Sequence, residues 1–185
     1  ADFKRIKYDN QYPKKMMTPK AMNLEMLMHL DASKYPDISD AIIQLTKWNR
    51  KSDLENITAA LFISTWLEID RIRTTSGRNV LYGTITEEDC VAGIRKAKKE
   101  LLEKYETTKV PLKKVQRLIR GKVNLPMAGM PDVLAAMYSK EHTNGTYKAF
   151  AGESYIELVR FGENGVEIES VNTFGASEKP TSEYY

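Results

Sequence analysis

The periodicity of the apolar residues changes along this chain of 185 residues. Between residues 37 and 105, apolar side chains recur every three or four positions, the spacing of an amphipathic helix. Residues 155–161 and 166–174 are instead rich in β-branched and aromatic side chains, and Asn164-Gly165 between them is a strong hairpin signal. The sequence therefore predicts an α+β fold, in which about four helices precede a small antiparallel sheet.

Four segments carry signals for the start of a helix. Thr18-Pro19 predicts a helix that runs to Leu30, because a hydroxyl can cap a helix and proline suits its first turn. Asp37 predicts the start of the second helix, and Asn56 is expected to cap the third. Residues 86–89, Thr-Glu-Glu-Asp, predict the fourth, since acidic side chains favour the positive end of a helix.

The residues between the helical part and the last strands show no clear period. Residues 111–121 are short and mixed, residues 125–131 predict a compact loop, and the polar residues 139–145 predict another. We therefore divide the chain into a helical subdomain, residues 1–110, and a loop and antiparallel β segment, residues 111–185.

The composition excludes several classes of protein. The hydrophobic content of 42% and charged content of 29% are typical of globular proteins, and no run of about 18 apolar residues could cross a membrane. The net charge of +3 is too balanced for a dedicated nucleic-acid binder. The single cysteine excludes an intrachain disulfide.

The residues that could carry chemistry do not form a complete catalytic set. Cys90 is expected to be a small buried side chain, His29 a packed histidine and His142 part of a loop. Without a His-x-x-x-His spacing, no metal site is predicted. Glu167 and Glu169 alternate with apolar residues, which is typical of the solvent face of a strand. Phosphate-binding loops and a Gly-x-Ser-x-Gly turn are also absent from the sequence.

Four stretches, taken in order, resemble the penicillin acylases and their relatives, the acyl-homoserine lactone and aculeacin acylases. Residues 45–49, Leu-Thr-Lys-Trp-Asn, before an alanine-containing helix, resemble the Leu-x-x-Trp-Asp segment of that family. Residues 125–129 resemble its Leu-Pro-x-x-Gly loop, and residues 152–155 its Gly-x-Ser-Tyr strand start. Residues 175–185 resemble its terminal Gly-x-Ser-x-x-Pro-x-Ser-Pro-His-Tyr motif. The residues that carry the resemblance are Trp48, Asn49, Pro126, Gly129, Gly152, Ser154, Tyr155, Gly175, Ser177, Pro180 and Ser182.

Three positions depart from the family pattern. Asn49 stands where the family usually has aspartate, and Glu183 and Tyr184 replace the proline and histidine of the terminal motif. These changes indicate a divergent branch or a difference in substrate.

The resemblance implies a carboxy-terminal part of the β chain of an N-terminal-nucleophile hydrolase, whose fold is an αββα sandwich and whose substrates are N-acyl amides such as β-lactam side chains or acyl-homoserine lactones. The family's serine nucleophile, its α-amino base and its oxyanion groups all precede the resembled segment. The resemblance therefore implies no catalytic residue in this chain and no cofactor. It also implies a periplasmic or secreted location, and as partners the α chain and the first part of the β chain.

One residue and two surfaces remain open at this point. Glu157 is a candidate for catalytic support, although an ordinary strand glutamate facing water is the commoner outcome. Strand residues such as Tyr155 and Phe161 would lack a partner sheet, so we expect self-association of the isolated piece. The alternative function is a non-catalytic helical module that binds a peptide. Its predicted groove is lined by Met22, Met26, Leu27 and Met28.

Overall fold

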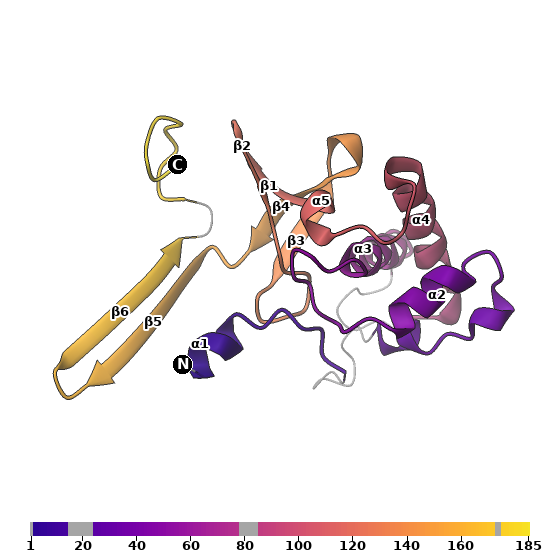
Figure 1. Ribbon diagram of the computed structural model, residues 1–185, viewed down its shortest axis with the longest axis horizontal. Helices are drawn as coiled ribbons and strands as arrows, with labels where there is room; N and C mark the ends of the chain where they lie inside the picture. The colour runs from indigo at the N-terminus through magenta and orange to yellow at the C-terminus, as the bar shows by residue number, and fades with distance from the viewer. Residues whose placement is uncertain (1, 15–23, 78–84, 173–174) are drawn as a thin grey trace.

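The structure, a computed structural model, describes residues 2–14, 24–77, 85–172 and 175–185 (Figure 1). Two long helices lie side by side, α3 (Ala59–Thr75) and α4 (Glu87–Tyr105). The shorter helical elements are α1 (Asp2–Lys7), the 3-10 helices η1 (Leu24–Met28) and η2 (Ala32–Lys34), α2 (Ser39–Thr46), α5 (Leu112–Val115) and the 3-10 helix η3 (Thr143–Gly145). Helices in the first part and strands in the second confirm the α+β class.

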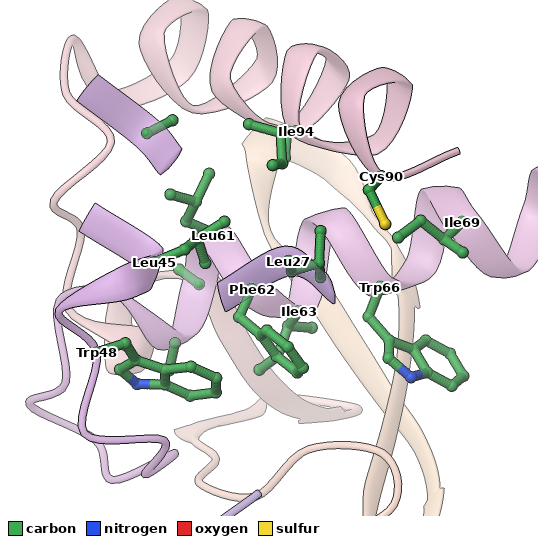
Figure 2. Packing of buried hydrophobic residues seen from close by; sticks show 14 of the residues in the cluster. Leu27, Leu45, Trp48, Leu61, Phe62, Ile63, Trp66, Ile69, Cys90 and Ile94 are labelled. Atoms are coloured by element: carbon green, nitrogen blue, oxygen red, sulfur yellow. The ribbon is translucent and has the colours of Figure 1, made fainter. Parts of the chain in front are cut away.

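Helix α3 forms the centre of the core, as expected from its apolar residues on more than one side. Every residue from Ala59 to Trp66 is buried. Figure 2 shows Phe62 beside Trp48, with ring centroids 4.5 Å apart, and Cys90 of α4 beside Ile69. Ile57 is 46% exposed, because it precedes the start of the helix.

Helix α4 begins at the predicted signal. The Thr86 hydroxyl accepts a hydrogen bond from the backbone N–H of Asp89 (3.2 Å), and the Asp89 carboxylate accepts one from the backbone N–H of Thr86 (3.0 Å). This capping box satisfies two N–H groups that the helix cannot bond internally. Gly93 then permits close approach to α3, since a Cβ at this position would lie 3.0 Å from Ile69 Cγ1.

The second helix begins two residues later than predicted, at Ser39. The Asp37 carboxylate does not cap it. Instead that carboxylate accepts hydrogen bonds from Arg95 Nε (2.6 Å) and Nη2 (3.3 Å) on α4, so an ion pair between elements replaces the expected cap. The predicted apolar stripe is confirmed, and its buried residues are Ile38, Ala41, Ile42, Leu45 and Trp48.

The prediction of a helix from Thr18 to Leu30 is wrong for those of its residues that the structure describes. Residues 15–23 lie outside the described residues, and Leu24–Met28 is a 3-10 helix rather than an α-helix. Asp31 then caps the separate helix η2 by accepting a hydrogen bond from the backbone N–H of Ser33 (3.0 Å), so the chain changes direction here.

A four-stranded sheet packs beside the helices. Its strands are β1 (Gln116–Arg120), β2 (Val123–Pro126), β3 (Met137–Glu141) and β4 (Tyr147–Gly152), in the order β2-β1-β4-β3. The outer pairs are antiparallel, whereas β1 and β4 run parallel. Three of these strands lie where the sequence predicted irregular structure. Strand β1 is partly buried along its length without alternation, and β3 ends in charged residues, so neither shows a period of two.

Strands β5 (Tyr155–Gly162) and β6 (Gly165–Asn172) form a separate hairpin, as predicted. Its turn consists of Glu163 and Asn164, and only the following Gly165 has a positive φ, +121°. The hairpin projects far from the helical body, and α1 lies beside it (Figure 1). Ion pairs of Lys4 with Glu169, and of Lys7 with Glu153 at 2.8 Å, hold α1 there.

One hydrophobic core connects the two parts of the chain. Val110, Leu112, Val115, Met130 and Tyr147 belong to the same buried cluster as the helices. The division near residue 110 stays a prediction. Within the described residues, no helix is both long enough and apolar enough to cross a membrane.

Candidate functional site

Trp48 and Asn56 join the loop after α2 to the first turn of α3. The buried indole of Trp48 packs on Phe62, and its Nε1–H donates a hydrogen bond to Asn56 Oδ1 (3.1 Å). The same oxygen accepts the backbone N–H groups of Thr58 and Ala59, both at 3.0 Å. The N-cap position of α3 is Thr58, without a side-chain cap, so the predicted cap Asn56 lies two residues too early. Asn56 still satisfies two N–H groups at the start of the helix, and Trp48 fixes its orientation.

Asn49 takes part in this junction from the exposed side. Its Oδ1 accepts hydrogen bonds from the backbone N–H of Lys51 (3.1 Å) and from Asn56 Nδ2 (2.8 Å). Its own amide nitrogen, Nδ2, donates to none of the described residues. An aspartate here could accept the same two hydrogen bonds. The departure from the family pattern therefore preserves the junction and adds one free donor.

A groove of about 870 Å³ opens beside this junction, between α2, the segment from Lys47 to Thr58, and residues 108–109. Gln44 crosses its floor. The Gln44 amide donates to Ile57 O (3.1 Å) and Thr108 O (3.2 Å), and it accepts the Thr108 hydroxyl at 2.7 Å. No local sequence pattern indicates this groove, because its walls come from three separate segments.

The Leu-Pro-x-x-Gly loop packs against the segment that follows Trp48. Buried Gln116 holds the loop by donating Nε2–H hydrogen bonds to Met127 O (3.1 Å) and Gly129 O (2.9 Å). The backbone N–H of Gly129 donates to Ser52 O (3.1 Å). Pro126 ends β2 at the start of this loop. The second family-like motif thus contacts the segment just after the first one.

The Gly-x-Ser-Tyr stretch connects the sheet to the hairpin. Gly152 ends β4, Ser154 is exposed between the strands, and Tyr155 begins β5. The Tyr155 hydroxyl donates a hydrogen bond to the exposed carboxylate of Glu157 (2.6 Å). The suggested catalytic-support role of Glu157 stays a prediction.

The terminal motif folds back onto the turn between β1 and β2. Arg120 Nη2 donates a hydrogen bond to Ser177 O (2.7 Å), and the Arg120 guanidinium lies 4.4 Å from the centre of the Tyr185 ring. Such a cation over an aromatic face is attracted by the ring. The motif therefore anchors the end of the chain to the sheet.

Residues within the terminal motif shape its own turns. Gly175 has a φ of +77°. The hydroxyl of Ser177 accepts the backbone N–H of the residue two positions later (3.1 Å), and the hydroxyl of Ser182 does the same (3.1 Å). Pro180 lies between these two serine turns. All four residues therefore act on the local backbone.

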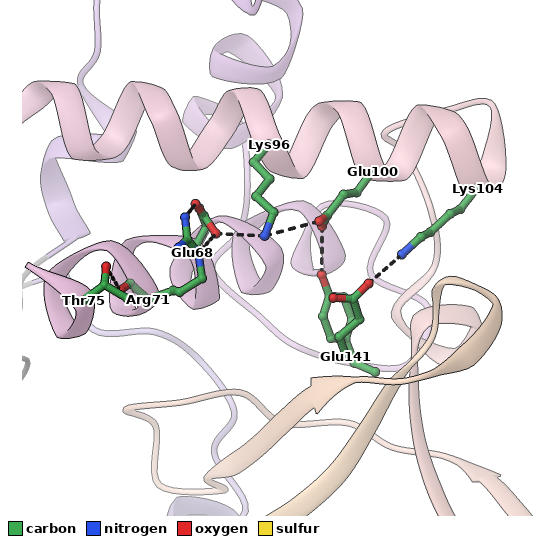
Figure 3. Close-up of polar contacts among 8 residues, drawn as sticks. Glu68, Arg71, Thr75, Lys96, Glu100, Lys104 and Glu141 are labelled. Atoms are coloured by element: carbon green, nitrogen blue, oxygen red, sulfur yellow. Dashed lines mark hydrogen bonds and ion pairs between the residues drawn. The ribbon is translucent and has the colours of Figure 1, made fainter.

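A chain of charged contacts links α3, α4 and the sheet (Figure 3). Glu68 of α3 is 7% exposed in its side chain and accepts hydrogen bonds from Arg71 Nη2 (2.5 Å) and Lys96 Nζ (2.9 Å). The Arg71 guanidinium holds the pKa of Glu68 below its ordinary value, with help from Lys96 and against the effect of burial.

The charged chain continues to the strands. The Tyr147 hydroxyl of β4 donates to Glu100 of α4 (3.3 Å), and Lys104 pairs with Glu141 of β3 (3.5 Å). Burial raises the pKa of Tyr147. Each carboxylate in this series of contacts has a cation or a hydroxyl as its partner. The contacts therefore connect α3, α4 and the four-stranded sheet.

The residues considered for catalysis lie apart. Cys90 is fully buried, as expected, and burial raises the pKa of its thiol to about 12. His29 was expected to be packed, but its side chain is 72% exposed and contacts Glu25 Oε1 at 3.0 Å. The loop predicted at residues 139–145 is partly strand, and His142 directly follows the end of β3.

The part of the chain that the structure describes holds no catalytic or metal cluster. Within these residues no serine or cysteine is hydrogen-bonded to a histidine, and no three His, Cys, Asp or Glu side chains are grouped to hold a metal ion. The described side chains therefore cannot assemble a serine or cysteine nucleophile with a histidine base.

The predicted methionine-lined groove is wrong. Leu27 and Met28 are buried in the core, and Met26 is 40% exposed. Met22 lies outside the described residues. Leu27 occupies the centre of the packed cluster (Figure 2), so this face is already covered by the protein itself.

Comparison with known proteins gives one family. The model of the penicillin amidase family matches residues 1–185, the whole chain. No curated protein matches the chain.

Proposed function

Because the chain belongs to the penicillin amidase family, we propose that it is the carboxy-terminal scaffold of an enzyme that hydrolyses N-acyl amide bonds. The observation that carries this proposal is the family match over all 185 residues. A scaffold role is supported by the contacts of the family-like motifs, which join a loop to the start of a helix, pack a loop and anchor the end of the chain.

In the proposed enzyme, the reaction takes place on residues outside this chain. A serine at the start of the β chain attacks the amide carbonyl, and its own α-amino group takes up the hydroxyl proton. Backbone and side-chain N–H groups stabilise the oxyanion, so the chemistry requires no cofactor. The enzyme is periplasmic or secreted. Its substrates are linear N-acyl amides such as β-lactam side chains or acyl-homoserine lactones.

The β5–β6 hairpin supports a contact with the rest of such an enzyme. Both strands lack a second neighbour among the described residues, so their outer edges are open. One face of the hairpin carries the cross-strand pairs Val159–Ile168 and Phe161–Val166. Their exposed fractions range from 43% for Val159 to 81% for Phe161. Open edges and exposed apolar pairs favour coverage by another sheet.

The isolated chain should cover this face by self-association. Size-exclusion chromatography with light scattering should give a molecular mass above that of the monomer and rising with concentration. Replacing Phe161 and Ile168 by threonine should shift the chain towards the monomer, because threonine keeps strand propensity while reducing apolar area. A strict monomer at high concentration would contradict the expectation.

The activity is tested on the full-length processed protein. We expect it to hydrolyse members of a panel of N-acyl amides, and we expect replacement of the amino-terminal serine of the β chain by alanine to abolish turnover. The isolated chain of residues 1–185 should be inactive on the same panel. Turnover by that chain alone, or undiminished turnover by the serine variant, would overturn the proposal.

A further inference from the structure

The groove beside α2 exposes two aliphatic side chains. Ile43 on α2 and Ile57 before α3 are each 46% exposed, and both line the groove. They belong to different segments, so the groove presents separate apolar contacts to an occupant. Exposed branched side chains in a concave site are available for burial by a ligand.

The acidic groups at the groove are already paired. The Asp40 carboxylate accepts a hydrogen bond from Lys98 Nζ (2.6 Å), and the Glu55 carboxylate accepts one from Lys113 Nζ (2.7 Å). The Thr108 hydroxyl donates to Gln44, as described above. The negative charge of each carboxylate is therefore offset by a lysine.

Three donors at the groove, on Lys47, Asn49 and Lys109, are unpaired among the described residues. Among the described residues, the ammonium groups of Lys47 and Lys109 have no ion-pair partner, and Asn49 Nδ2 has no acceptor. Two cations and one amide donor thus accompany the two isoleucines. This pattern is complementary to negative charge and carbonyl oxygens.

We propose that the groove binds an acidic polypeptide segment that carries aliphatic side chains. The aliphatic side chains contact Ile43 and Ile57, and the carboxylates pair with Lys47 and Lys109. A peptide supplies carboxylates and aliphatic groups at repeated positions, so it can contact both cations and both isoleucines. A volume of about 870 Å³ is large enough for several side chains.

Asn49 favours the binding of an anionic partner in the groove, because it adds a hydrogen-bond donor without adding negative charge. Its Oδ1 holds the helix junction, and its Nδ2 is free to donate to a carboxylate or a backbone carbonyl. An aspartate at this position would keep both accepted hydrogen bonds, remove the donor and add a negative charge. The Asn49→Asp variant therefore separates recognition from folding.

The test measures binding of synthetic peptides to the chain of residues 1–185. One probe is a decapeptide of alternating leucine and glutamate, and its matched control has lysine in place of glutamate. Methyl NMR spectra of isoleucine-labelled protein report Ile43 and Ile57 directly, with buried Ile94 as internal reference. We expect the acidic probe alone to shift the Ile43 and Ile57 signals in a saturable manner. Octanoate serves as the small-carboxylate probe.

Two sets of variants complete the test. Lys47→Gln with Lys109→Gln should weaken binding at least about tenfold, since two charge contacts are lost. Asn49→Asp should weaken it by a similar factor while the chain unfolds at an unchanged urea concentration. The control double variant, Lys122→Gln with Lys179→Gln, removes two exposed lysines outside the groove and should bind as the parent does.

Three outcomes would overturn the inference. They are equal binding of the acidic and basic peptides, saturation by octanoate without peptide binding, and equal loss of affinity in the control double variant. Peptide binding in the groove is independent of the proposed amidase activity, because the binding test measures no turnover.

Discussion

At the scale of single residues, burial controls the chemistry of Cys90. Loss of hydration raises the pKa of the thiol to about 12, and the nearby acidic groups of Asp89 and Glu87 add to this shift. Only the thiolate reacts with disulfide reagents. We expect no reaction with Ellman's reagent in the folded chain at pH 8, and one equivalent in denaturing urea. Rapid stoichiometric reaction of the folded chain would contradict the described burial.

Gly129 is required by its backbone conformation and its surroundings. Its φ is +93°, and a Cβ would lie 2.6 Å from Ala135 O. Gly129→Ala should therefore destabilise the chain by about 2–4 kcal/mol in urea unfolding, through strain and displaced backbone. Gly77→Ala is the matched control, because Gly77 has a φ of +70° with open space around it. A similar loss for both variants would show that sterics at Gly129 are unimportant.

Local signals made some residues predictable and long-range contacts made others unpredictable. The capping box of Thr86 and Asp89 lies within four consecutive residues, so the sequence displays it directly. The role of Asp37 depends on Arg95, which is 58 residues away. The same holds for Asn49. The sequence shows its departure from aspartate, but its free donor becomes visible only with the hydrogen bonds of the junction.

At the scale of elements, helices were easier to predict than strands. The buried residues of α4 recur at helical spacing along one continuous segment, so their periodicity is visible in the sequence. Strand β1 pairs in parallel with β4 across an intervening hairpin and loop, and its half-buried residues do not alternate. The β5–β6 hairpin was predictable because its strands and turn are adjacent in sequence.

Glu68 is the main charged connection between α3 and α4. Glu68→Gln would remove the carboxylate and leave Arg71 and Lys96 without it. Because these cations are 57% and 44% exposed, water can replace part of the lost interaction. We expect a loss of about 1–2 kcal/mol in urea unfolding, below that of a fully buried pair. The control is Glu103→Gln, whose carboxylate pairs with Lys99 at 3.8 Å on the surface and should cost less than about 0.5 kcal/mol.

At the scale of the whole molecule, one buried core joins the helices to the four-stranded sheet, and one hairpin lies outside this core. The helices and the four-stranded sheet share a buried cluster, whereas the β5–β6 hairpin projects from it with its apolar pairs exposed (Figure 1). The family-like motifs join a loop to a helix, the sheet to the hairpin and the terminal segment to the sheet, and among the described residues they form no catalytic cluster. The resemblance predicts a structural role for these motifs, but it could not predict the groove beside α2.

The charges of the whole molecule also set its stability in acid. Arg50 lowers the pKa of Glu25, and Arg71 with Lys96 lowers that of Glu68. Since both folded pKa values lie below the ordinary 4.5, their stabilisation is complete above that pH and is lost as the pH falls through the lower folded values.

Two half-buried carboxylates act in the opposite direction. Burial raises the pKa of Asp70 and of Asp132 above the ordinary 3.8, so the cost of their charges is present at neutral pH and is relieved in acid. Their effect offsets part of the loss from Glu25 and Glu68. The net slope therefore depends on whether the ion pairs outweigh the buried charges.

We expect the ion pairs to dominate, because Arg50 holds Glu25 through two hydrogen bonds and Glu68 has two cationic partners. The urea midpoint of the parent chain should fall as the pH is lowered from about 5 to about 3. In the double variant Glu25→Gln with Glu68→Gln, the midpoint should be lower at pH 7 and change less over the same interval. Parallel profiles for the two proteins would show that other carboxylates control the acid response. A midpoint that rises in acid would show that Asp70 and Asp132 outweigh the ion pairs.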